Sequence, residues 1–225
     1  MSTLLMKLLS LAAAGTMLTS SAMDVAAPQH DPEGLLFLAN REWRVTKAFV
    51  PEYRLTNVPG QVRNLRDDAA TALEKMYAAC KEETGVTLVS VSGYRSYTKQ
   101  QNIYNRKLKN VGSKAKADEY VARPGASEHQ IALAMDVGQK GNTNLSAGFA
   151  KTEGGQWLAA NCWRFGFIIR YQQGWEEITG YEYEPWHVRY VGEEYAKMIY
   201  EKNVPFETFM KDLRESILLD IVEGN

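Results

Sequence analysis

The spacing of apolar residues predicts a series of short elements along the 225-residue chain. From Val62 to Cys80 the apolar positions recur with helical spacing, and Gly85 supplies a stop. The stretch "VTLVSVSG" that follows is short and β-branched, which predicts a buried strand. A second helix begins after Ser96, whose hydroxyl can cap it, and a third is predicted over "SKAKADEYVA".

The second half of the chain alternates between strand-like and helix-like patterns. Residues 131–137, "FIIRY" and "EPWHVRY" are predicted to be extended. Helices are predicted over "TEGGQWLAANCWRFG", "GEEYAKMIYEKN" and "PFETFMKDLRESILLD". Because helices cluster early and late with strands mostly between them, the pattern predicts an α+β fold in which helices flank a small antiparallel sheet.

The first 39 residues differ from the rest of the chain. An apolar run from Leu8 to Leu18 follows Lys7, and Ser20 and Ala22 fit the small-x-small pattern of a signal-peptidase site. The run is shorter than the roughly 20 residues that a membrane-spanning helix needs. We therefore predict a signal peptide over residues 1–22, a linker over 23–39 and one domain over 40–225. A buried N-terminal helix and an uncleaved membrane anchor are the alternatives.

Composition excludes some partners and leaves one question about cysteine open. The apolar content of 45% and charged content of 24% are those of a globular domain. The net charge of −1, without a polybasic tract, gives no support to nucleic-acid binding. Cys80 and Cys162 are the only cysteines. In an exported protein they either form a disulfide or remain two buried thiols, and sequence alone does not decide between these.

Histidine is scarce, which makes its placement informative. Of three histidines, His30 lies in the predicted linker, and His129 and His187 each have a carboxylate nearby. Catalytic zinc takes three protein ligands of this kind and one water, so His129, Asp136 and His187 could form such a set. Seven residues span about 10 Å on one helix, and on one strand they point to opposite faces. A shared metal therefore requires a bend between His129 and Asp136. Two unrelated histidines are the alternative.

Two further side chains are candidates for chemistry. Glu184 stands three residues before His187, where it could act as a general base beside a metal. Arg95 directly follows the predicted buried strand, and its guanidinium is shaped to receive a carboxylate such as a peptide C-terminus. A surface glutamate and a surface ion pair are the respective alternatives.

Three ordered blocks, "SGYRSYTKQ", "SEHQIALAMD" and "EPWHVRYVG", resemble the signature blocks of the VanY-type zinc D-alanyl-D-alanine carboxypeptidases. These enzymes belong to the LAS metallopeptidases, which act on bacterial cell-wall peptides. The likeness spans about residues 40–200. The resemblance implies that His129, Asp136 and His187 bind Zn²⁺ on the small sheet and that Glu184 is the catalytic acid/base.

The resemblance also implies a substrate site and exposes one departure. Arg95 matches the residue that binds the substrate's terminal carboxylate, Ser127 assists it, and Gln100 matches a glutamine after the Arg block. The family block has glycine where this chain has Ala132. If that glycine uses a positive φ, Ala132 introduces strain on the order of 1 kcal/mol.

The implied activity is removal of the C-terminal D-alanine from peptidoglycan stem peptides by an extracytoplasmic enzyme, whether secreted, periplasmic or associated with the cell wall. Three alternatives share these motifs. They are an L,D-carboxypeptidase acting on tetrapeptide stems, a cell-wall endopeptidase and a non-catalytic cell-wall-binding module of the same fold.

Overall fold

The computed structural model describes residues 31–32 and 34–223, with side chains up to residue 219. The predicted signal peptide and most of the predicted linker lie outside the described residues. Among the described helices, none is long and apolar enough to cross a membrane. The regular elements in chain order are β1 Arg54–Leu55, β2 Asn64–Leu65, α3 Asp67–Thr84, β3 Leu88–Ser92, α4 Tyr97–Val111, α5 Lys114–Tyr120, β4 Ala134–Gln139, α6 Glu153–Asn161, β5 Phe167–Tyr171, α7 Glu176–Thr179, β6 Glu184–Tyr190, α8 Glu193–Lys202 and α9 Phe206–Glu223.

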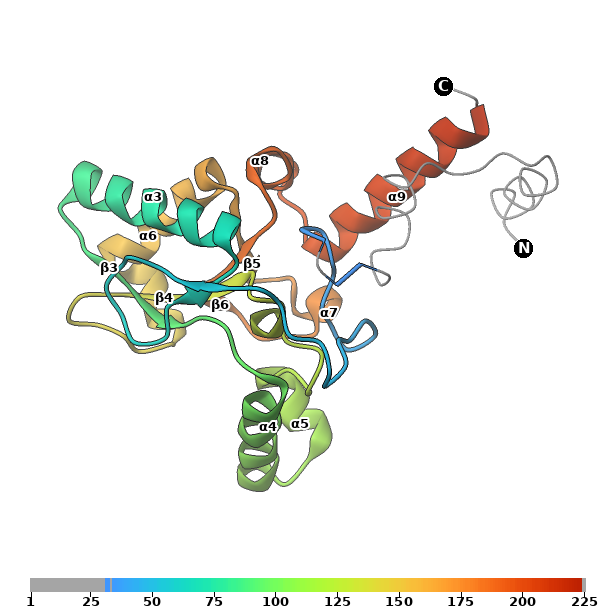
Figure 1. Cartoon of the computed structure of the whole chain (residues 1–225), viewed down its shortest axis with the longest axis horizontal. Helices are drawn as coiled ribbons and strands as arrows, with labels where there is room; N and C mark the ends of the chain where they lie inside the picture. Colours follow the sequence, from blue (N-terminus) through green and yellow to red (C-terminus); the bar gives the residue numbers. More distant parts are fainter. Residues whose placement is uncertain (1–30, 33, 224–225) are drawn as a thin grey trace.

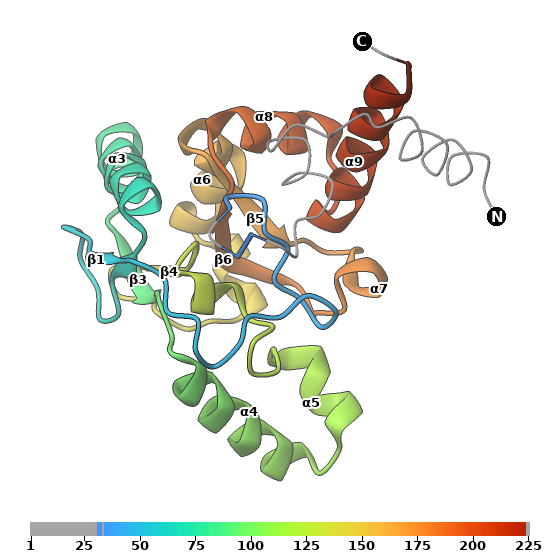
Figure 2. The same cartoon turned by 45° about the vertical axis from the view of Figure 1, so that its right-hand side comes forward.

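A four-stranded antiparallel sheet lies at the centre of the molecule, in the order β3-β4-β6-β5. Helices α3, α6 and α8 lie on one side of this sheet, and the pair α4 and α5 lies on the other (Figures 1 and 2). Helix α9 starts near the sheet and points away from it (Figure 1). This arrangement confirms the predicted α+β fold with a small antiparallel sheet flanked by helices.

The α3 helix forms where the apolar spacing predicts it. Its buried face includes Leu73, Met76 and Cys80, which pack in the main core cluster. Asp67 and Asp68 occupy the first turn, where carboxylates interact favourably with the helix dipole. Gly85 ends the helix with φ 77°, a left-handed conformation that glycine adopts without strain. The predicted stop agrees with the observed one, but the predicted start at Val62 is too early, because Asn64–Leu65 forms β2 and the helix begins at Asp67.

The two faces of the sheet have different environments because side chains alternate along each strand. On β4, Met135 and Val137 join the main core cluster with α3 and α6. Asp136, between them, points to the opposite face, which is the side of α4 and α5. That face is therefore free to carry a polar site.

The bend required between His129 and Asp136 is present. Residues Glu128–Ile131 form a short 3₁₀ turn, Ala132 ends it with φ 55° and ψ 30°, and β4 begins two residues later. The prediction that residues 131–137 are all extended is wrong at its start, because the chain turns there before the strand begins. Ala132 occupies the left-handed region, which is the case in which an alanine at the family's glycine position is strained.

One further sequence prediction needs correction, and the structure answers the question that the sequence left open about the cysteines. Phe37, Leu38 and Ala39, at the end of the predicted linker, are buried in the two core clusters. The packed domain therefore begins before residue 40. Cys80 and Cys162 are both free and buried, so the alternative of two thiols is correct and the disulfide is not formed. Burial raises the pKa of the Cys162 thiol to about 12, which makes it unreactive.

Candidate active site

The His129 ring is held by the backbone of a distant loop. It is buried in the 3₁₀ turn, and its Nδ1 lies 2.9 Å from the carbonyl oxygen of Gly93, to which the Nδ1–H donates. Its Nε2 lies 3.4 Å from Oδ2 of Asp136 and makes no hydrogen bond within the described part of the chain. Burial and the nearby Arg95 lower the pKa of His129 to about 4, so the ring is neutral. Nε2 is therefore an available lone pair.

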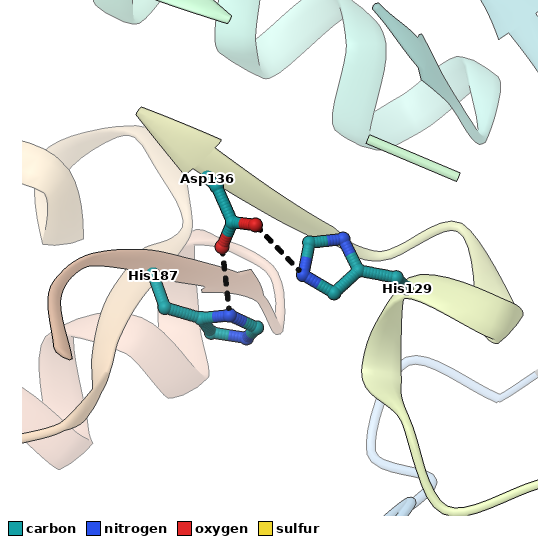
Figure 3. Close-up of side chains that lie close together, drawn as sticks. All are labelled: His129, Asp136 and His187. Carbon is teal, nitrogen blue, oxygen red and sulfur yellow. Dashed lines mark hydrogen bonds and ion pairs between the residues drawn. The ribbon is translucent and has the colours of Figure 1, made fainter. Parts of the chain in front are cut away.

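Asp136 and His187 are placed side by side by strand pairing. They are directly opposite each other in the β4–β6 register, which puts both side chains on one face. Asp136 Oδ1 lies 3.1 Å from His187 Nδ1 (Figure 3). Burial alone would lower the pKa of His187, but hydrogen bonds to Asp136 and Glu128 raise it to about 9.

The structure brings the three predicted metal ligands together. His129, Asp136 and His187 each offer one ligand atom, and these atoms lie within 4.8 Å of one another (Figure 3). Two imidazole nitrogens and one carboxylate oxygen form a donor set that suits catalytic zinc. The unpartnered Nε2 of His129 gives independent support, because a buried nitrogen without a hydrogen bond is costly unless another group occupies that position.

Glu184 lies at the start of β6 beside this group. Its Oε2 is 3.7 Å from Nδ1 of His187, and its side chain is 19% exposed. Burial raises the pKa of Glu184 to about 7. A carboxyl group with a pKa near neutrality can both accept and return a proton at that pH, which is what a general acid/base requires.

The remaining predicted residues line one cavity with the cluster. This cavity has a volume of about 180 Å³ and includes Arg95, Gln100, Ser127, Glu184 and the three candidate ligands in its wall. The Nε of Arg95 and the Oε1 of Gln100 are buried without hydrogen-bond partners among the described residues. Gln100 Nε2 donates to the carbonyl oxygen of Ala122 at 2.7 Å. The structure thus brings together all seven predicted site residues.

Sequence reasoning missed three residues of this region. Tyr171 and Tyr181 line the same cavity, and the hydroxyl of Tyr181 is buried without a partner in the described chain. Glu128 is fully buried and contacts Nε2 of His187 through its Oε2 at 3.3 Å. The sequence signal that could have identified Glu128 is its position next to His129 in "SEHQ". A carboxylate that is buried with the rest of such a motif needs a charged partner.

A sequence model of the VanY family, described as D-alanyl-D-alanine carboxypeptidase, matches residues 62–193, which is more than half of the chain. The chain belongs to the VanY family. YodJ of Bacillus subtilis (strain 168), which is named as a carboxypeptidase, is 39% identical to this chain over 195 residues. The match covers 82% of this chain and 70% of YodJ. Membership in the VanY family confirms the enzyme class predicted from the three motifs.

Two solved peptidase structures are similar to this chain. The LdcB LD-carboxypeptidase has a TM-score of 0.76 and 40% identity, covering 80% of this chain and 87% of LdcB. A VanY D,D-pentapeptidase from a VanB-type vancomycin-resistance cassette, in complex with Zn(II), has a TM-score of 0.66 and 34% identity. That match covers 78% of this chain and 98% of the pentapeptidase.

Proposed function

We propose that this VanY-type carboxypeptidase removes the C-terminal D-alanine from peptidoglycan stem peptides ending in D-Ala-D-Ala. The observation that carries the proposal is the close grouping of His129, Asp136 and His187 beside the partly buried Glu184. The family match and the D,D-pentapeptidase structure support the choice of substrate.

Zinc is the proposed cofactor, held by His129, Asp136 and His187. The zinc complex of the D,D-pentapeptidase supports this choice, as does the donor set of two nitrogens and one carboxylate oxygen. When bound, Zn²⁺ polarises the scissile carbonyl and lowers the pKa of a water molecule to about 7.

Glu184 is the proposed general acid/base. Its carboxylate accepts a proton from the attacking water at Oε2, and it returns that proton to the leaving amine. The position of Glu184 in the cavity wall, together with its pKa of about 7, supports this role. Glu184 lies beside the cluster without being part of the three-residue group, so it can transfer protons instead of binding the metal.

Arg95 and Ser127 are the proposed carboxylate-binding residues. A guanidinium offers donors in a fork that fits a carboxylate, and the Nε of Arg95 has no partner in the described chain. Gln100 has a different proposed task. Its amide nitrogen is already used on Ala122, and its free Oε1 is an acceptor. It therefore fits an N–H of the substrate's last residues better than their carboxylate.

Synthetic stem peptides test the proposal. The purified chain is incubated with a pentapeptide ending in D-Ala-D-Ala, with and without a chelator, and the products are identified by mass spectrometry. We expect loss of one alanine, blocked by the chelator and restored by Zn²⁺. A C-terminally amidated pentapeptide should be cleaved poorly, because Arg95 then has no carboxylate to bind. Equal cleavage of the amidated peptide would indicate an endopeptidase, and zinc binding without any cleavage would indicate a non-catalytic module.

An L,D-carboxypeptidase is the second candidate, and the similarity to LdcB at 40% identity favours it. In that case a tetrapeptide stem is the substrate, and the bond cleaved follows an L-centre. The same assay distinguishes the two activities, because the pentapeptide is shortened by one residue in the first case and the tetrapeptide is shortened in the second.

We also propose that the chain acts outside the cytoplasm, with residues 1–22 as its signal peptide and 23–39 as a linker that ends in the packed domain. The cell-wall substrate of this enzyme class supports that location. N-terminal sequencing of the exported protein tests it, with a mature chain starting near residue 23 as the expected result. A chain retained in the membrane with an intact N-terminus would indicate an uncleaved anchor.

A further inference from the structure

Four charged side chains form a buried cluster behind the candidate metal site. Glu128, Arg170 and Arg189 have fully buried side chains, and the side chain of Glu207 is 16% exposed. They come from four places in the chain, namely the 3₁₀ turn at residues 128–131, β5, β6 and the first turn of α9. Two arginines and two glutamates balance in charge, which burial requires.

This cluster contacts the metal site through one atom pair. Glu128 Oε2 lies 3.3 Å from His187 Nε2, so the Nε2–H can donate to it, while Nδ1 of the same ring faces Asp136 at 3.1 Å. His129 is oriented differently, because its Nδ1–H donates to the carbonyl oxygen of Gly93. One candidate ligand is thus held by a neutral acceptor and the other by a carboxylate. A carboxylate acceptor fixes the tautomer of a ligating histidine and increases its basicity.

Two arginines hold Glu128 in the position that this contact needs. Its Oε1 accepts hydrogen bonds from Arg170 Nε at 2.8 Å and from Arg189 Nη1 at 2.9 Å. Both donors bind the same oxygen, which leaves Oε2 for His187. Arg189 Nη2 also donates to the carbonyl oxygens of Leu35 and Phe37, at 2.8 and 2.9 Å. The arginine is therefore fixed on its other side by the N-terminal segment.

Glu207 completes the cluster from the last helix. It accepts hydrogen bonds from Arg170 Nη1 at 2.9 Å and from Nη2 at 2.5 Å, a bidentate arrangement that orients the guanidinium. No α9 residue whose side chain is described, from Phe206 to Leu219, is in the wall of the active-site cavity. The hydrogen-bonded route from this helix to the site is the sequence of contacts Glu207–Arg170–Glu128–His187. The Phe206 ring, also on α9, packs against the guanidinium groups of Arg170 and Arg189.

We propose that Glu128 and Glu207 are positioning residues for the metal site. Glu128 holds His187 with Nε2 protonated and Nδ1 directed to the metal, and Glu207 keeps Arg170 aligned on Glu128. The C-terminal helix therefore sets part of the metal affinity although it does not reach the cavity. This inference depends on the proposed function, because it takes His129, Asp136 and His187 as the ligands.

Zinc affinity of the full chain tests the inference without any activity measurement. Zn²⁺ dissociation constants are measured by competition with a chromophoric chelator for the wild type, Glu128→Gln, Glu207→Gln and Glu215→Gln. Glu215 lies on α9 with an exposed side chain, so it is the matched control. We expect roughly 10- to 100-fold weaker binding for Glu128→Gln. The loss should be smaller, at least about threefold, for Glu207→Gln, and the control should be unchanged.

A spectroscopic measurement separates positioning from general loss of structure. In the zinc-loaded wild type, ¹H–¹⁵N correlation spectra should show His187 protonated at Nε2 with a strongly downfield proton, and His129 protonated at Nδ1. Glu128→Gln should shift the His187 proton upfield and leave the His129 proton in place. If Glu128→Gln does not fold, because it leaves two buried arginines short of a partner, Glu207→Gln supplies the same test.

Two results would count against the inference, and they can be told apart. If the wild type binds zinc and both folded variants bind it equally well, the positioning role is wrong while the proposed function stands. If the wild type and a His129→Ala variant are alike in binding no zinc, the metal site itself is wrong, and the inference is overturned together with the proposed function.

Discussion

Ala132 adopts a left-handed backbone conformation, with φ 55°, at the position where the family block has glycine. This conformation costs a non-glycine residue about 1–2 kcal/mol. Two effects oppose that cost. Burial of the methyl group stabilises the folded state by roughly 0.8 kcal/mol. Glycine at this position would lose more conformational entropy on folding than alanine does, which costs about 0.5–1 kcal/mol. The departure is therefore nearly neutral, and the site geometry around the bend is intact.

We expect Ala132→Gly to change the free energy of unfolding by less than about 1 kcal/mol, since the strain, burial and entropy terms above nearly cancel. Ala132→Val should be destabilising by about 2 kcal/mol or more. A β-branched residue is a poor fit to this conformation, and Ala132 is completely buried. Urea denaturation of the three proteins measures both effects. A Val variant as stable as the wild type would show that the turn opens in solution.

Glu184→Gln should retain zinc and lose activity. The amide keeps the size of the side chain but cannot accept the proton, so kcat should fall by several orders of magnitude while metal content stays near one equivalent. Glu182→Gln, two residues earlier with an exposed side chain, is the control and should keep full activity. Substantial hydrolysis by Glu184→Gln would assign the proton transfer to another group.

At the scale of elements, the α4–α5 pair forms the wall of the cavity opposite the sheet, and Asp118 holds this pair together. Its Oδ1 accepts hydrogen bonds from Tyr104 of α4 at 2.8 Å and from Arg123 Nε at 2.9 Å. Its Oδ2 accepts one from Arg123 Nη2 at 2.5 Å. The contacts with Arg123 hold the pKa of Asp118 below its usual range. The carboxylate is therefore part of what positions Gln100 and the end of α5.

Asp118→Asn should lower the free energy of unfolding by about 1–3 kcal/mol at neutral pH, since it weakens charge-assisted hydrogen bonds. Because the folded-state pKa of Asp118 is lowered, its stabilisation is present above the unfolded pKa of about 3.9 and is lost as the pH falls through the folded value. Urea denaturation at pH 7 and near pH 3 should show a difference from wild type that shrinks at the lower pH. Asp212→Asn, exposed on α9, is the control. A difference that is equal at both pH values would contradict the assignment to this carboxylate.

At the scale of the whole molecule, the proposed metal links segments that are far apart in the sequence. The 3₁₀ turn, β4 and β6 each supply one ligand, so zinc binding should stabilise the folded state as a unit. At a free zinc concentration 1,000 times the dissociation constant, the stabilisation is about 4 kcal/mol.

We therefore expect chelation to lower the melting temperature of the wild type by several degrees. His129→Ala should have a melting temperature that zinc does not change, because one of three ligands is missing. Thermal unfolding of both proteins, with and without Zn²⁺, measures the effect. If Zn²⁺ raised the melting temperature of His129→Ala as much as that of the wild type, the stabilising metal would be bound at another site.

Prediction from sequence succeeded where the signal is local or where motifs act jointly. The α3 helix follows from apolar spacing and from Gly85, and its buried residues are those that the pattern indicates. The seven site residues predicted from three ordered blocks, each weak alone, all lie in the wall of one cavity, and their individual roles stay predictions. The missed features are different in kind. The burial of Phe37 in the core and the partners of Glu128 depend on contacts with segments more than 40 residues away, which no local pattern reports.

The sequence alone determined the elements, the catalytic chemistry available and the need for a turn between His129 and Asp136. These properties depend on residue type and on spacing within a few turns of the chain. Tertiary structure decided which groups meet. The β4–β6 register places Asp136 opposite His187, and the packing of β5 and α9 connects Glu207 to the same histidine through Arg170 and Glu128. Strand order and side-chain direction are set by packing of the whole core, so these contacts become visible only in the folded molecule.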